Sequence, residues 1–400
     1  MSPTNPSPHF DVSTFRRFLP FHPDLPLPIP MESGLVQSGP SSGPASHLYP
    51  CSSVSICGSS RAAVVAVNLA LAGMSPLNPC IVIVGPTAGG KTELAIELAT
   101  RLPGTGECIC ADSMQIYRGM DIGTAKPTAA QRSAVPHHLL DLVDPSEDGF
   151  SVDRWLALAQ DAISQIRERG RWPIVVGGTN LYIQALLHGL FDGPEPAPEL
   201  RNAIAALDDE ALRQRLQAID PPAAARIHAN DRRRAIRAIE VFEQTGKRIS
   251  DLQSQWSSMA TVPADLQLIG LEYSVQTINA RINARVKAMF EAGLVEEVRR
   301  VQGSGGLGCQ ASEALGYRQV LEHLAGRLSL DETTEQIKIA TRRLAKQQRT
   351  WLRRFRRHGG SAWVEADDLS PQELVNEVLA ALGHRQPSPP GSGPSQGGSA

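Results

Sequence analysis

The amino-acid sequence predicts an α/β fold, in which a core of parallel strands is flanked by helices and carries an inserted helical subdomain. Three observations support this prediction. Short apolar, β-branched runs alternate with helical patterns between residues 80 and 176, as they do in parallel sheets with crossover helices. A glycine-rich phosphate-binding motif joins the first of these runs to a helix. From about residue 193 the chain becomes helical and charged, before a further strand-like run begins at Leu266.

The composition argues against a strongly basic, a disulfide-linked or a membrane-spanning protein. The 400 residues carry a formal net charge of −2 at pH 7, so any nucleic-acid surface has to be a local patch. The six cysteines form no C-x-x-C pair, which is typical of reduced, buried thiols and not of disulfides or a zinc site. No apolar run approaches the roughly 18 residues of a membrane span. We therefore expect a cytoplasmic protein without a membrane partner.

Five segments are expected along the chain. Residues 1–75 are rich in proline, serine and glycine and are predicted to be a disordered extension. Because Met74 leads almost directly into the first strand, it is a candidate for the natural start. The other segments are the first part of the core at 78–192, the helical insertion at 193–262, the second part of the core with a basic C-terminal helix at 263–382, and a disordered tail at 383–400.

The motif that organises the core runs from Gly85 to Thr92 and matches G-x-x-x-x-G-K-[ST]. An apolar run at 80–84 precedes it and a helical pattern at 93–99 follows it. In this context backbone N–H groups and the helix N-terminus face an anion, Lys91 adds a positive charge, and Thr92 offers a hydroxyl to Mg²⁺. The core is therefore expected to be P-loop NTPase-like. The predicted diphosphate- or nucleotide-binding residues are Gly85, Pro86, Thr87, Ala88, Gly89, Gly90, Lys91 and Thr92.

Two further strands are predicted at 107–111 and 173–176, with a helix at 151–170 between them. Asp112 follows the first of these strands and Gly177 follows the second. Ligands in open α/β sheets bind outside the carboxyl ends of the strands, so we expect Asp112 to face the bound phosphate.

Arginines dominate the rest of the chain. The insertion contains an arginine-rich helix start at 231–242, and a strand is predicted at 266–271. A helix then places Arg281 and Arg285 one turn apart. A long helix from about 335 to 357 carries a nearly single-signed basic run, which favours nucleic-acid binding over a merely solvated face.

The order of these motifs resembles the tRNA dimethylallyltransferase (tRNA isopentenyltransferase) family. The resemblance covers about residues 80–365, and the absence of a C-terminal zinc finger favours the bacterial type. Gly89 stands where many members carry serine, an exchange of small residues that is not expected to affect a backbone cradle. The motifs that carry the resemblance are 85–92, 111–117, 119–127, 176–179, 231–242, 281–285 and 316–318.

The resemblance implies transfer of a dimethylallyl group from dimethylallyl diphosphate to N6 of adenine 37, beside the anticodon of a tRNA, giving N6-isopentenyladenosine. It further implies Mg²⁺ as cofactor and the anticodon stem-loop as partner, and we expect a monomer. Asp112 is the candidate general base, Thr87 lies beside the bridging diphosphate oxygen, and Arg285 faces the leaving diphosphate. Two alternatives stay open, Asp112 as a partner of Mg²⁺ and Arg281 in place of Arg285. The predicted tRNA-binding residues are Asp112, Ser113, Met114, Gln115, Thr179, Arg201, Arg233, Arg234, Arg237, Gly316, Tyr317 and Arg318.

Two other functions are compatible with the phosphate motif. A small-molecule or nucleoside kinase would use ATP on the same loop, and it would transfer phosphate but no prenyl group. A non-catalytic, GTPase-like RNA-binding module would bind tRNA tightly, and Thr87→Ala or Asp112→Ala would change that binding little.

Overall fold

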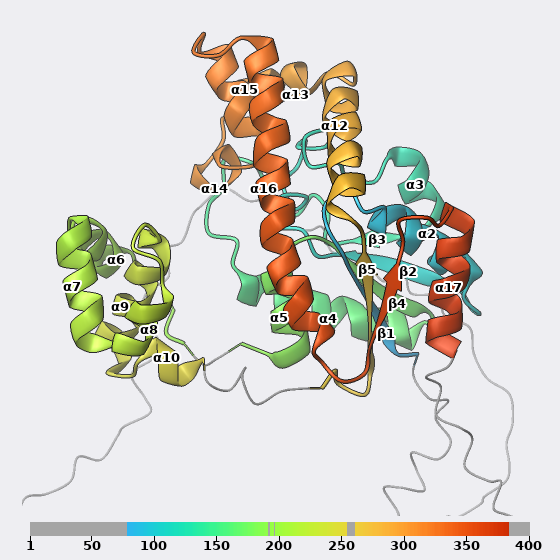
Figure 1. The fold of residues 1–400 in the computed structure, drawn as a ribbon, viewed down its shortest axis with the longest axis horizontal. Helices are drawn as coiled ribbons and strands as arrows, with labels where there is room; N and C mark the ends of the chain where they lie inside the picture. The colour runs from blue at the N-terminus through green and yellow to red at the C-terminus, as the bar shows by residue number, and fades with distance from the viewer. Residues whose placement is uncertain (1–77, 191–192, 196, 254–260, 384–400) are drawn as a thin grey trace, which may run out of the picture. The chain divides into compact units, whose positions relative to one another are not determined.

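The structure, a computed structural model, describes residues 78–190, 193–195, 197–253 and 261–383. The predicted extension at 1–75 and the tail beyond residue 383 lie outside these ranges. Six parallel strands form one sheet in the order β3-β2-β4-β1-β5-β6 (Figure 1). The predicted α/β core is thereby confirmed. The strands are β1 (Cys80–Val84), β2 (Gly106–Cys110), β3 (His137–His138), β4 (Trp172–Val176), β5 (Leu266–Glu272) and β6 (Ser361–Glu365).

Helices cover both faces of the sheet, so the central strands are continuous apolar runs. Val82 and Val84 of β1 belong to one core, and Ile81 and Ile83 belong to the other. The first core is completed by α4 (Val152–Glu168), α5 (Asn180–His188), α12 (Val275–Glu291) and α16 (Leu330–Arg356), and the second by α2 (Lys91–Arg101) and α17 (Pro371–Gly383).

The first core also holds the helices between α12 and α16. Tyr317, Val298 and Ala311 are all buried there, which joins this helical layer to the sheet. The connecting helices are α13 (Leu294–Gly303), α14 (Cys309–Ser312) and α15 (Tyr317–Leu324).

The inserted segment has a hydrophobic core of its own, formed by residues such as Leu216, Ala238 and Ile239. Aspartates cap its helices: Asp208 and Asp231 each accept a hydrogen bond from the backbone three residues on, an arrangement that stabilises a helix start. Its helices are α6 (Pro198–Ala205), α7 (Asp209–Ile219), α8 (Pro221–Arg226), α9 (Arg232–Thr245) and α10 (Ile249–Leu252).

The structure differs from the prediction mainly at the sheet edges. The two-residue strand β3 follows a short helix, α3 (Ala129–Ala134), and β6 and α17 extend the core beyond the basic helix. The strands β3 and β6 are short or only partly buried, so their sequence periodicity is weak. The basic helix α16 begins at Leu330 because Ser329 and Glu332 form a capping box there. Among the described residues, no helix combines the length and apolar composition needed to cross a membrane.

Candidate active site

The phosphate loop, Gly85–Thr92, connects β1 to α2 at the carboxyl edge of the sheet. Its turn uses left-handed backbone at Ala88 (φ 60°) and Gly90 (φ 73°), a conformation that costs a non-glycine residue roughly 1 kcal/mol. Gly90 is also the residue before α2, and no side chain caps this helix. The first N–H groups of α2 therefore remain available for an anion.

The space around Gly89 in this loop is narrow. A Cβ atom on Gly89 would lie 2.9 Å from the Pro86 carbonyl oxygen and 3.3 Å from the Tyr273 ring. Contacts below 3 Å with backbone require the backbone to move, so a serine at this position does not fit the present loop conformation. Glycine fits the present loop conformation without such a shift.

Charged groups from three separate segments meet beside the loop. Lys91 Nζ donates to the carbonyl oxygens of Gly85 (3.1 Å) and Pro86 (2.8 Å). Burial, followed by the nearby Arg285 guanidinium, lowers the pKa of Lys91 to about 8, while Asp112 and Glu93 act in the opposite direction. Burial also lowers the pKa of Arg285, against the same two carboxylates. Lys91, Asp112 and Arg285 therefore share one electrostatic environment.

Arg281 and Arg285 have different surroundings. Arg281 stacks over the Tyr273 ring at 4.6 Å from its centroid, and the Tyr273 hydroxyl donates to the Gly89 carbonyl oxygen at 3.0 Å. Arg281 therefore supports the phosphate loop through an aromatic neighbour. Arg285 interacts electrostatically with Lys91 and Asp112, which favours it as the leaving-group arginine.

The residues that follow the parallel neighbours β2 and β4 contact each other closely. Ala111 N donates to the Val176 carbonyl oxygen at 2.8 Å, and Thr179 N donates to the Ala111 carbonyl oxygen at 3.0 Å. A Cβ atom on Gly177 would lie 2.1 Å from that Ala111 oxygen. Only glycine fits at this contact, and the contact fixes where Asp112 leaves the sheet.

Side-chain bonds then shape the segment after Asp112. Its Oδ1 accepts from Met114 N at 2.9 Å. The Thr179 hydroxyl accepts from Ser113 N at 2.9 Å and lies 3.2 Å from the Ser113 hydroxyl oxygen. Thr179 thus holds the Asp112–Met114 segment from the β4 side, a role within the protein that the sequence did not reveal.

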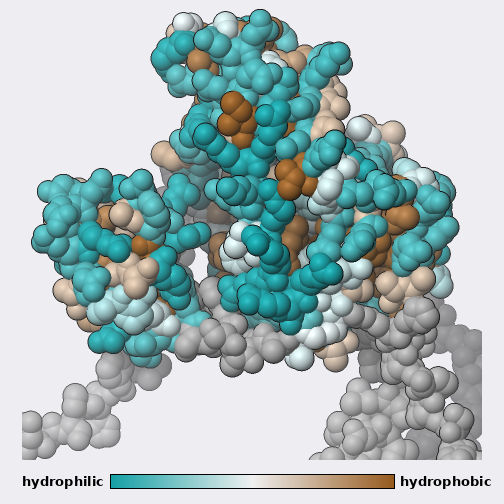
Figure 2. Space-filling model, in the orientation of Figure 1, coloured by the Kyte–Doolittle hydropathy of each residue, from teal (hydrophilic) through white to brown (hydrophobic). Residues whose placement is uncertain are grey.

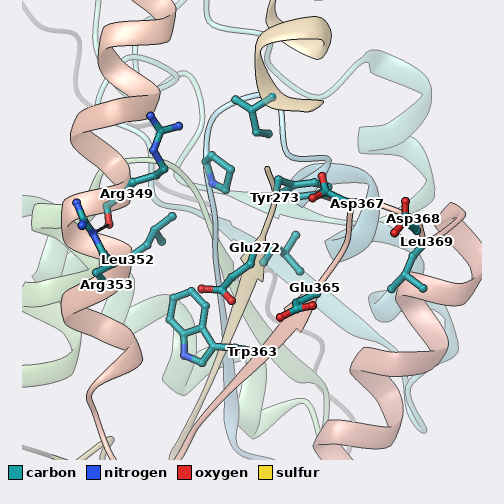
Figure 3. A pocket seen from close by; sticks show the side chains of 13 residues that line it. Glu272, Tyr273, Arg349, Leu352, Arg353, Trp363, Glu365, Asp367, Asp368 and Leu369 are labelled. Atoms are coloured by element: carbon teal, nitrogen blue, oxygen red, sulfur yellow. Dashed lines mark hydrogen bonds between the residues drawn. The ribbon is translucent and has the colours of Figure 1, made fainter. Parts of the chain in front are cut away.

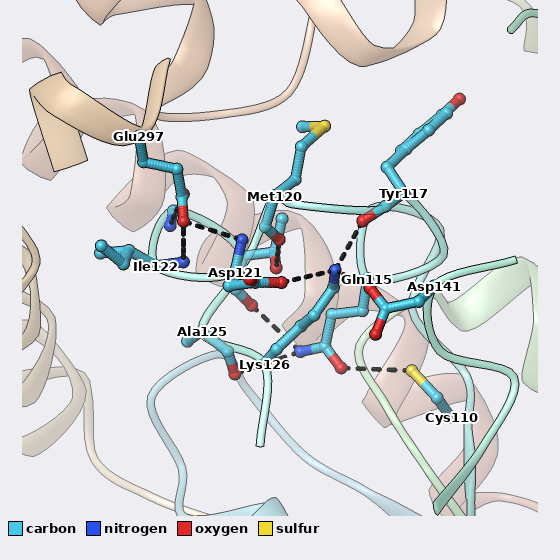
Figure 4. A network of polar contacts seen from close by, with 12 residues as sticks. Cys110, Gln115, Tyr117, Met120, Asp121, Ile122, Ala125, Lys126, Asp141 and Glu297 are labelled. Atoms are coloured by element: carbon cyan, nitrogen blue, oxygen red, sulfur yellow. Dashed lines mark hydrogen bonds and ion pairs between the residues drawn. The ribbon is translucent and has the colours of Figure 1, made fainter. Parts of the chain in front are cut away.

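Gln115 and Lys126 hold the loop that follows β2 (Figure 4). Gln115 Nε2 donates to the carbonyl oxygens of Thr124 (3.0 Å) and Ala125 (3.3 Å). The buried Lys126 ammonium donates to the Tyr117 carbonyl oxygen and to the carboxylates of Asp121 and Asp141. The Gln115 amide nitrogen is therefore bonded inside the protein, and its contact with tRNA stays a prediction.

Glu297 of α13 anchors the same loop from the other side. Its carboxylate, which is buried, accepts from the backbone nitrogens of Asp121, Ile122 and Gly123 at 2.8–3.1 Å and from the Tyr317 hydroxyl. The Tyr317 side chain is fully buried, which corrects its prediction as a tRNA contact. Its neighbour Arg318 is exposed and pairs with Glu313 at 3.3 Å, and Gly316 precedes α15 with a φ of 97°.

The four predicted arginines of the insertion fall into two groups. Arg201 and Arg237 pair with the fully buried Glu240 at 2.7 and 2.8 Å, and Arg237 also donates to the Pro194 carbonyl oxygen. Arg201 therefore joins α6 to α9, and Arg237 joins α9 to the segment before α6, roles that their charge alone did not predict. Arg233 and Arg234 are exposed, and Arg234 pairs with its own cap, Asp231.

The basic helix α16 presents a predominantly hydrophilic surface (Figure 2). Arg342 donates to Asn283 Oδ1 at 2.5 Å, and Arg356 pairs with Glu272 at 2.6 Å. Arg349 and Arg353 line a cavity of about 740 Å³ that reaches Pro86 of the phosphate loop (Figure 3). Its remaining walls are Leu271, Glu272, Tyr273, Ile278, Leu352, Trp363, Glu365, Asp367, Asp368 and Leu369.

Sequence reasoning missed Gln348, a buried glutamine of α16. Its Oε1 accepts from Thr87 N at 2.8 Å and its Nε2 donates to the Gly178 carbonyl oxygen at 3.1 Å. The available signal is periodicity: Gln348 lies on the helical stripe of Ala345 and Leu352, both of which are buried. A polar residue on an apolar stripe needs partners, and these lie in two distant loops.

Comparisons with known proteins agree with this geometry. A family whose sequence model is described as IPP transferase matches residues 115–355. The chain is 46% identical over 302 residues to a tRNA dimethylallyltransferase of Anaeromyxobacter dehalogenans, covering 74% of this chain and 98% of that protein. It is 47% identical over 303 residues to the corresponding protein of Geobacillus thermodenitrificans, with coverages of 74% and 93%.

Solved structures are similar over the same span. The full-length tRNA isopentenylpyrophosphate transferase of Bacillus halodurans aligns with a TM-score of 0.56 at 40% identity, covering 77% of this chain and 98% of that one. A eukaryotic dimethylallyltransferase described as acting on tRNA aligns with a TM-score of 0.62 at 28% identity, with coverages of 75% and 77%.

Proposed function

This chain belongs to the tRNA dimethylallyltransferase (IPP transferase) family, and on that premise we propose that it transfers a dimethylallyl group from dimethylallyl diphosphate to N6 of adenine 37 in tRNA. The observation that carries the proposal is the shared environment of the phosphate loop, Asp112 and Arg285. None of the comparisons favours a kinase.

In the proposed reaction the bond between C1 of the dimethylallyl group and the diphosphate oxygen breaks, and its electron pair leaves with the diphosphate. The N6 lone pair forms the new bond to C1, and N6 gives one proton to the Asp112 carboxylate. An exocyclic amine is a weak nucleophile because its lone pair is delocalised into the ring. A base at this point is typically worth about 10²–10⁴-fold in rate.

The phosphate loop would hold the leaving group. Negative charge grows on the diphosphate as the bond breaks, and the first N–H groups of α2, Lys91 and Arg285 can stabilise it. Losing one such preorganised contact typically costs on the order of 3 kcal/mol of barrier. Thr87 lies within the loop and is proposed to face the bridging oxygen of the diphosphate.

The donor set beside the loop suits Mg²⁺. Thr92 is the second residue of α2, directly after Lys91, and the carboxylates of Asp112 and Glu93 act on Lys91 and Arg285. A hydroxyl, carboxylates and diphosphate oxygens are the hard oxygen ligands that Mg²⁺ prefers. In the part of the chain that the structure describes, no cluster of three His, Cys, Asp or Glu forms a closed metal site. We therefore propose that Mg²⁺ is held by Thr92 together with the diphosphate, where it would neutralise leaving-group charge.

The acceptor base would reach Asp112 from a single-stranded loop, where extrusion costs less than it does in a duplex. The Ser113–Met114 backbone beside Asp112 is proposed to contact the base. Phosphates would be bound by the exposed Arg233 and Arg234 of the insertion, by Arg318, and by basic residues of α16 such as Arg343 and Lys346.

The deciding experiment incubates the protein with Mg²⁺, unmodified tRNA and labelled dimethylallyl diphosphate, and in parallel with labelled ATP. We expect label from the prenyl donor to appear at adenine 37 and none to be transferred from ATP. Transfer of phosphate without prenyl transfer would contradict the proposal.

Two further proposals concern assembly and location. We propose that the protein acts as a monomer, which light scattering after gel filtration would test. A tRNA substrate supports a cytoplasmic location, which imaging of a tagged chain in its own cells would test.

A further inference from the structure

Gln348 joins the two halves of the proposed reaction site through one side chain. Its acceptor oxygen binds the backbone nitrogen of Thr87 in the phosphate loop, at 2.8 Å, and its donor nitrogen binds the carbonyl oxygen of Gly178 after β4, at 3.1 Å. The side chain is almost completely buried, with 4% of the residue exposed. Both functions of the amide are therefore used inside the protein.

The same amide lies close to the candidate base. A Cβ atom on Gly178 would stand 3.1 Å from Gln348 Nε2 and 3.6 Å from Asp112 Oδ2. The amide and the carboxylate are thus neighbours of the same backbone position. Thr87 belongs to the side that holds the leaving group, and Asp112 belongs to the side that receives the proton.

We propose that Gln348 is a positioning residue of the transfer reaction, which fixes the phosphate loop relative to the strand end that carries Asp112. The proposal rests on the proposed function, because it assigns the two loops to the leaving group and to the nucleophile. Displacing reacting groups by as little as 1 Å can lower a rate by about 100-fold. A bond that ties both loops to one rigid helix is suited to prevent such displacement.

Helix packing determines the position of the amide. Gln348 lies on the buried stripe of α16 between Ala345 and Leu352, which are 1% and 7% exposed. A helix packed along this stripe has little freedom to rotate or slide, since either motion would expose apolar side chains. The amide is therefore presented to the two loops by the core and not by a flexible surface segment.

The chemistry of the site also explains why an amide is suited to this position. The bridge needs one acceptor for Thr87 N–H and one donor for the Gly178 carbonyl oxygen. A neutral amide supplies both, a carboxylate supplies only acceptors, and an ammonium or guanidinium supplies only donors. A neutral group also adds no charge beside Lys91, Arg285 and Asp112.

The test compares Gln348 with Gln347, the exposed glutamine that precedes it on the same helix. Methionine and glutamate are introduced at each position. For Gln348→Met we expect kcat to fall by roughly 100-fold, while the KM for tRNA stays within a few-fold and the melting temperature stays near that of the parent chain. The corresponding Gln347 variants should keep the parent kcat.

Gln348→Glu tests the positioning role through the pH dependence of kcat, which a purely structural role of Gln348 would not change. The ionised carboxylate accepts from Thr87 N–H but cannot donate to Gly178. The protonated carboxyl restores both bonds. We therefore expect the ratio of variant to parent kcat to rise about tenfold between about pH 8 and about pH 5.5, because burial raises the pKa of the introduced carboxyl. Taking the ratio removes the titration that both enzymes share.

The outcomes separate the two proposals. Absence of prenyl transfer by the parent chain would overturn the proposed function. With an active parent, equal kcat values for the Gln348 and Gln347 variants, or a pH-independent ratio for Gln348→Glu, would overturn the positioning role. If Gln348→Met fails to fold, the pH profile of the isosteric Gln348→Glu variant still tests the positioning role.

Discussion

Asp112 is the residue whose chemistry can be tested most directly. Asparagine keeps its size and can still accept from Met114 N, but it cannot take a proton. For Asp112→Asn we expect kcat to fall about 10²–10⁴-fold, with tRNA affinity within a few-fold of the parent. Single-turnover transfer and filter binding measure the two quantities. Asp153→Asn, at an exposed position of α4, is the control, and a parent-like rate in Asp112→Asn would refute the base assignment.

The buried Lys91 ammonium should make the affinity for an anionic ligand depend on pH. Its pKa is lowered to about 8 by burial and by Arg285, and a bound anion favours the charged form. Affinity for inorganic diphosphate with Mg²⁺ should therefore be full below about pH 8 and fall as the pH rises through that value. Lys91→Arg keeps its charge over this range, so the ratio of parent to variant affinity should decrease with pH in calorimetry. A constant ratio would contradict the prediction.

At the scale of elements, the close contact between the ends of β2 and β4 positions Asp112. For Gly177→Ala we expect a loss of roughly 3 kcal/mol in the free energy of unfolding, because the new methyl group would overlap the Ala111 carbonyl. The rate of prenyl transfer should fall as well, since the same contact positions Asp112. Denaturant unfolding measures the first effect. Gly303→Ala is the control, because a Cβ atom there meets nothing within 4 Å.

Some arginines of helix α9 are paired within the protein and others are exposed. The exposed ones are the variants that test tRNA binding. Arg237 pairs with the buried Glu240, whereas Arg233 and Arg234 are exposed. For Arg233→Ala/Arg234→Ala we expect weaker tRNA binding and a salt slope shallower by roughly 1–2. Arg215→Ala, which removes an ion pair with Glu243 on the same subdomain, should leave the slope unchanged. Equal slopes in the parent and the double variant would exclude these arginines as phosphate contacts.

At the scale of the whole molecule, two histidines from distant segments form a buried contact. His188 Nε2 and His358 Nε2 lie 2.7 Å apart. His358 Nδ1 lies 3.1 and 3.2 Å from the Arg354 and Phe355 carbonyl oxygens, so it carries the proton and leaves Nε2 as the acceptor. His188 must then donate, which places an unprotonated, unpaired and buried Nδ1 on its other side.

This contact makes stability depend on pH. Burial, His358 and Arg354 lower the pKa of His188 to about 4, whereas an unfolded histidine titrates near 6.5. The unfolded chain therefore binds the proton first, so the contribution is fully present above about pH 6.5 and is lost as the pH falls toward 4, by at most about 3 kcal/mol. His188→Gln should flatten the melting temperature over this range, and His228→Asn, at an exposed histidine, should not. An equal pH dependence in His188→Gln and the parent would contradict this account.

Local sequence was sufficient for several features. Apolar β-branched runs predicted β1, β4 and β5, and the alternation of strands and helices predicted a parallel sheet. The phosphate loop and Asp112 follow strands directly, and parallel strands bring their carboxyl ends to one edge, so their proximity was predictable. The short edge strand β3 and the partly buried β6 were not, because their few residues show no clear period.

The sequence by itself determined the phosphate loop, the parallel core and the family, because each depends on residues that are close together in the chain or on the order of motifs. Only the tertiary structure decided how individual side chains are used. Tyr317 and Gln115 are bonded inside the protein, Glu240 holds Arg201 and Arg237, and Gln348 bridges Thr87 and Gly178. A hydrogen bond between residues far apart in sequence depends on how the core packs, and a charge or an amide in the sequence does not reveal its partner.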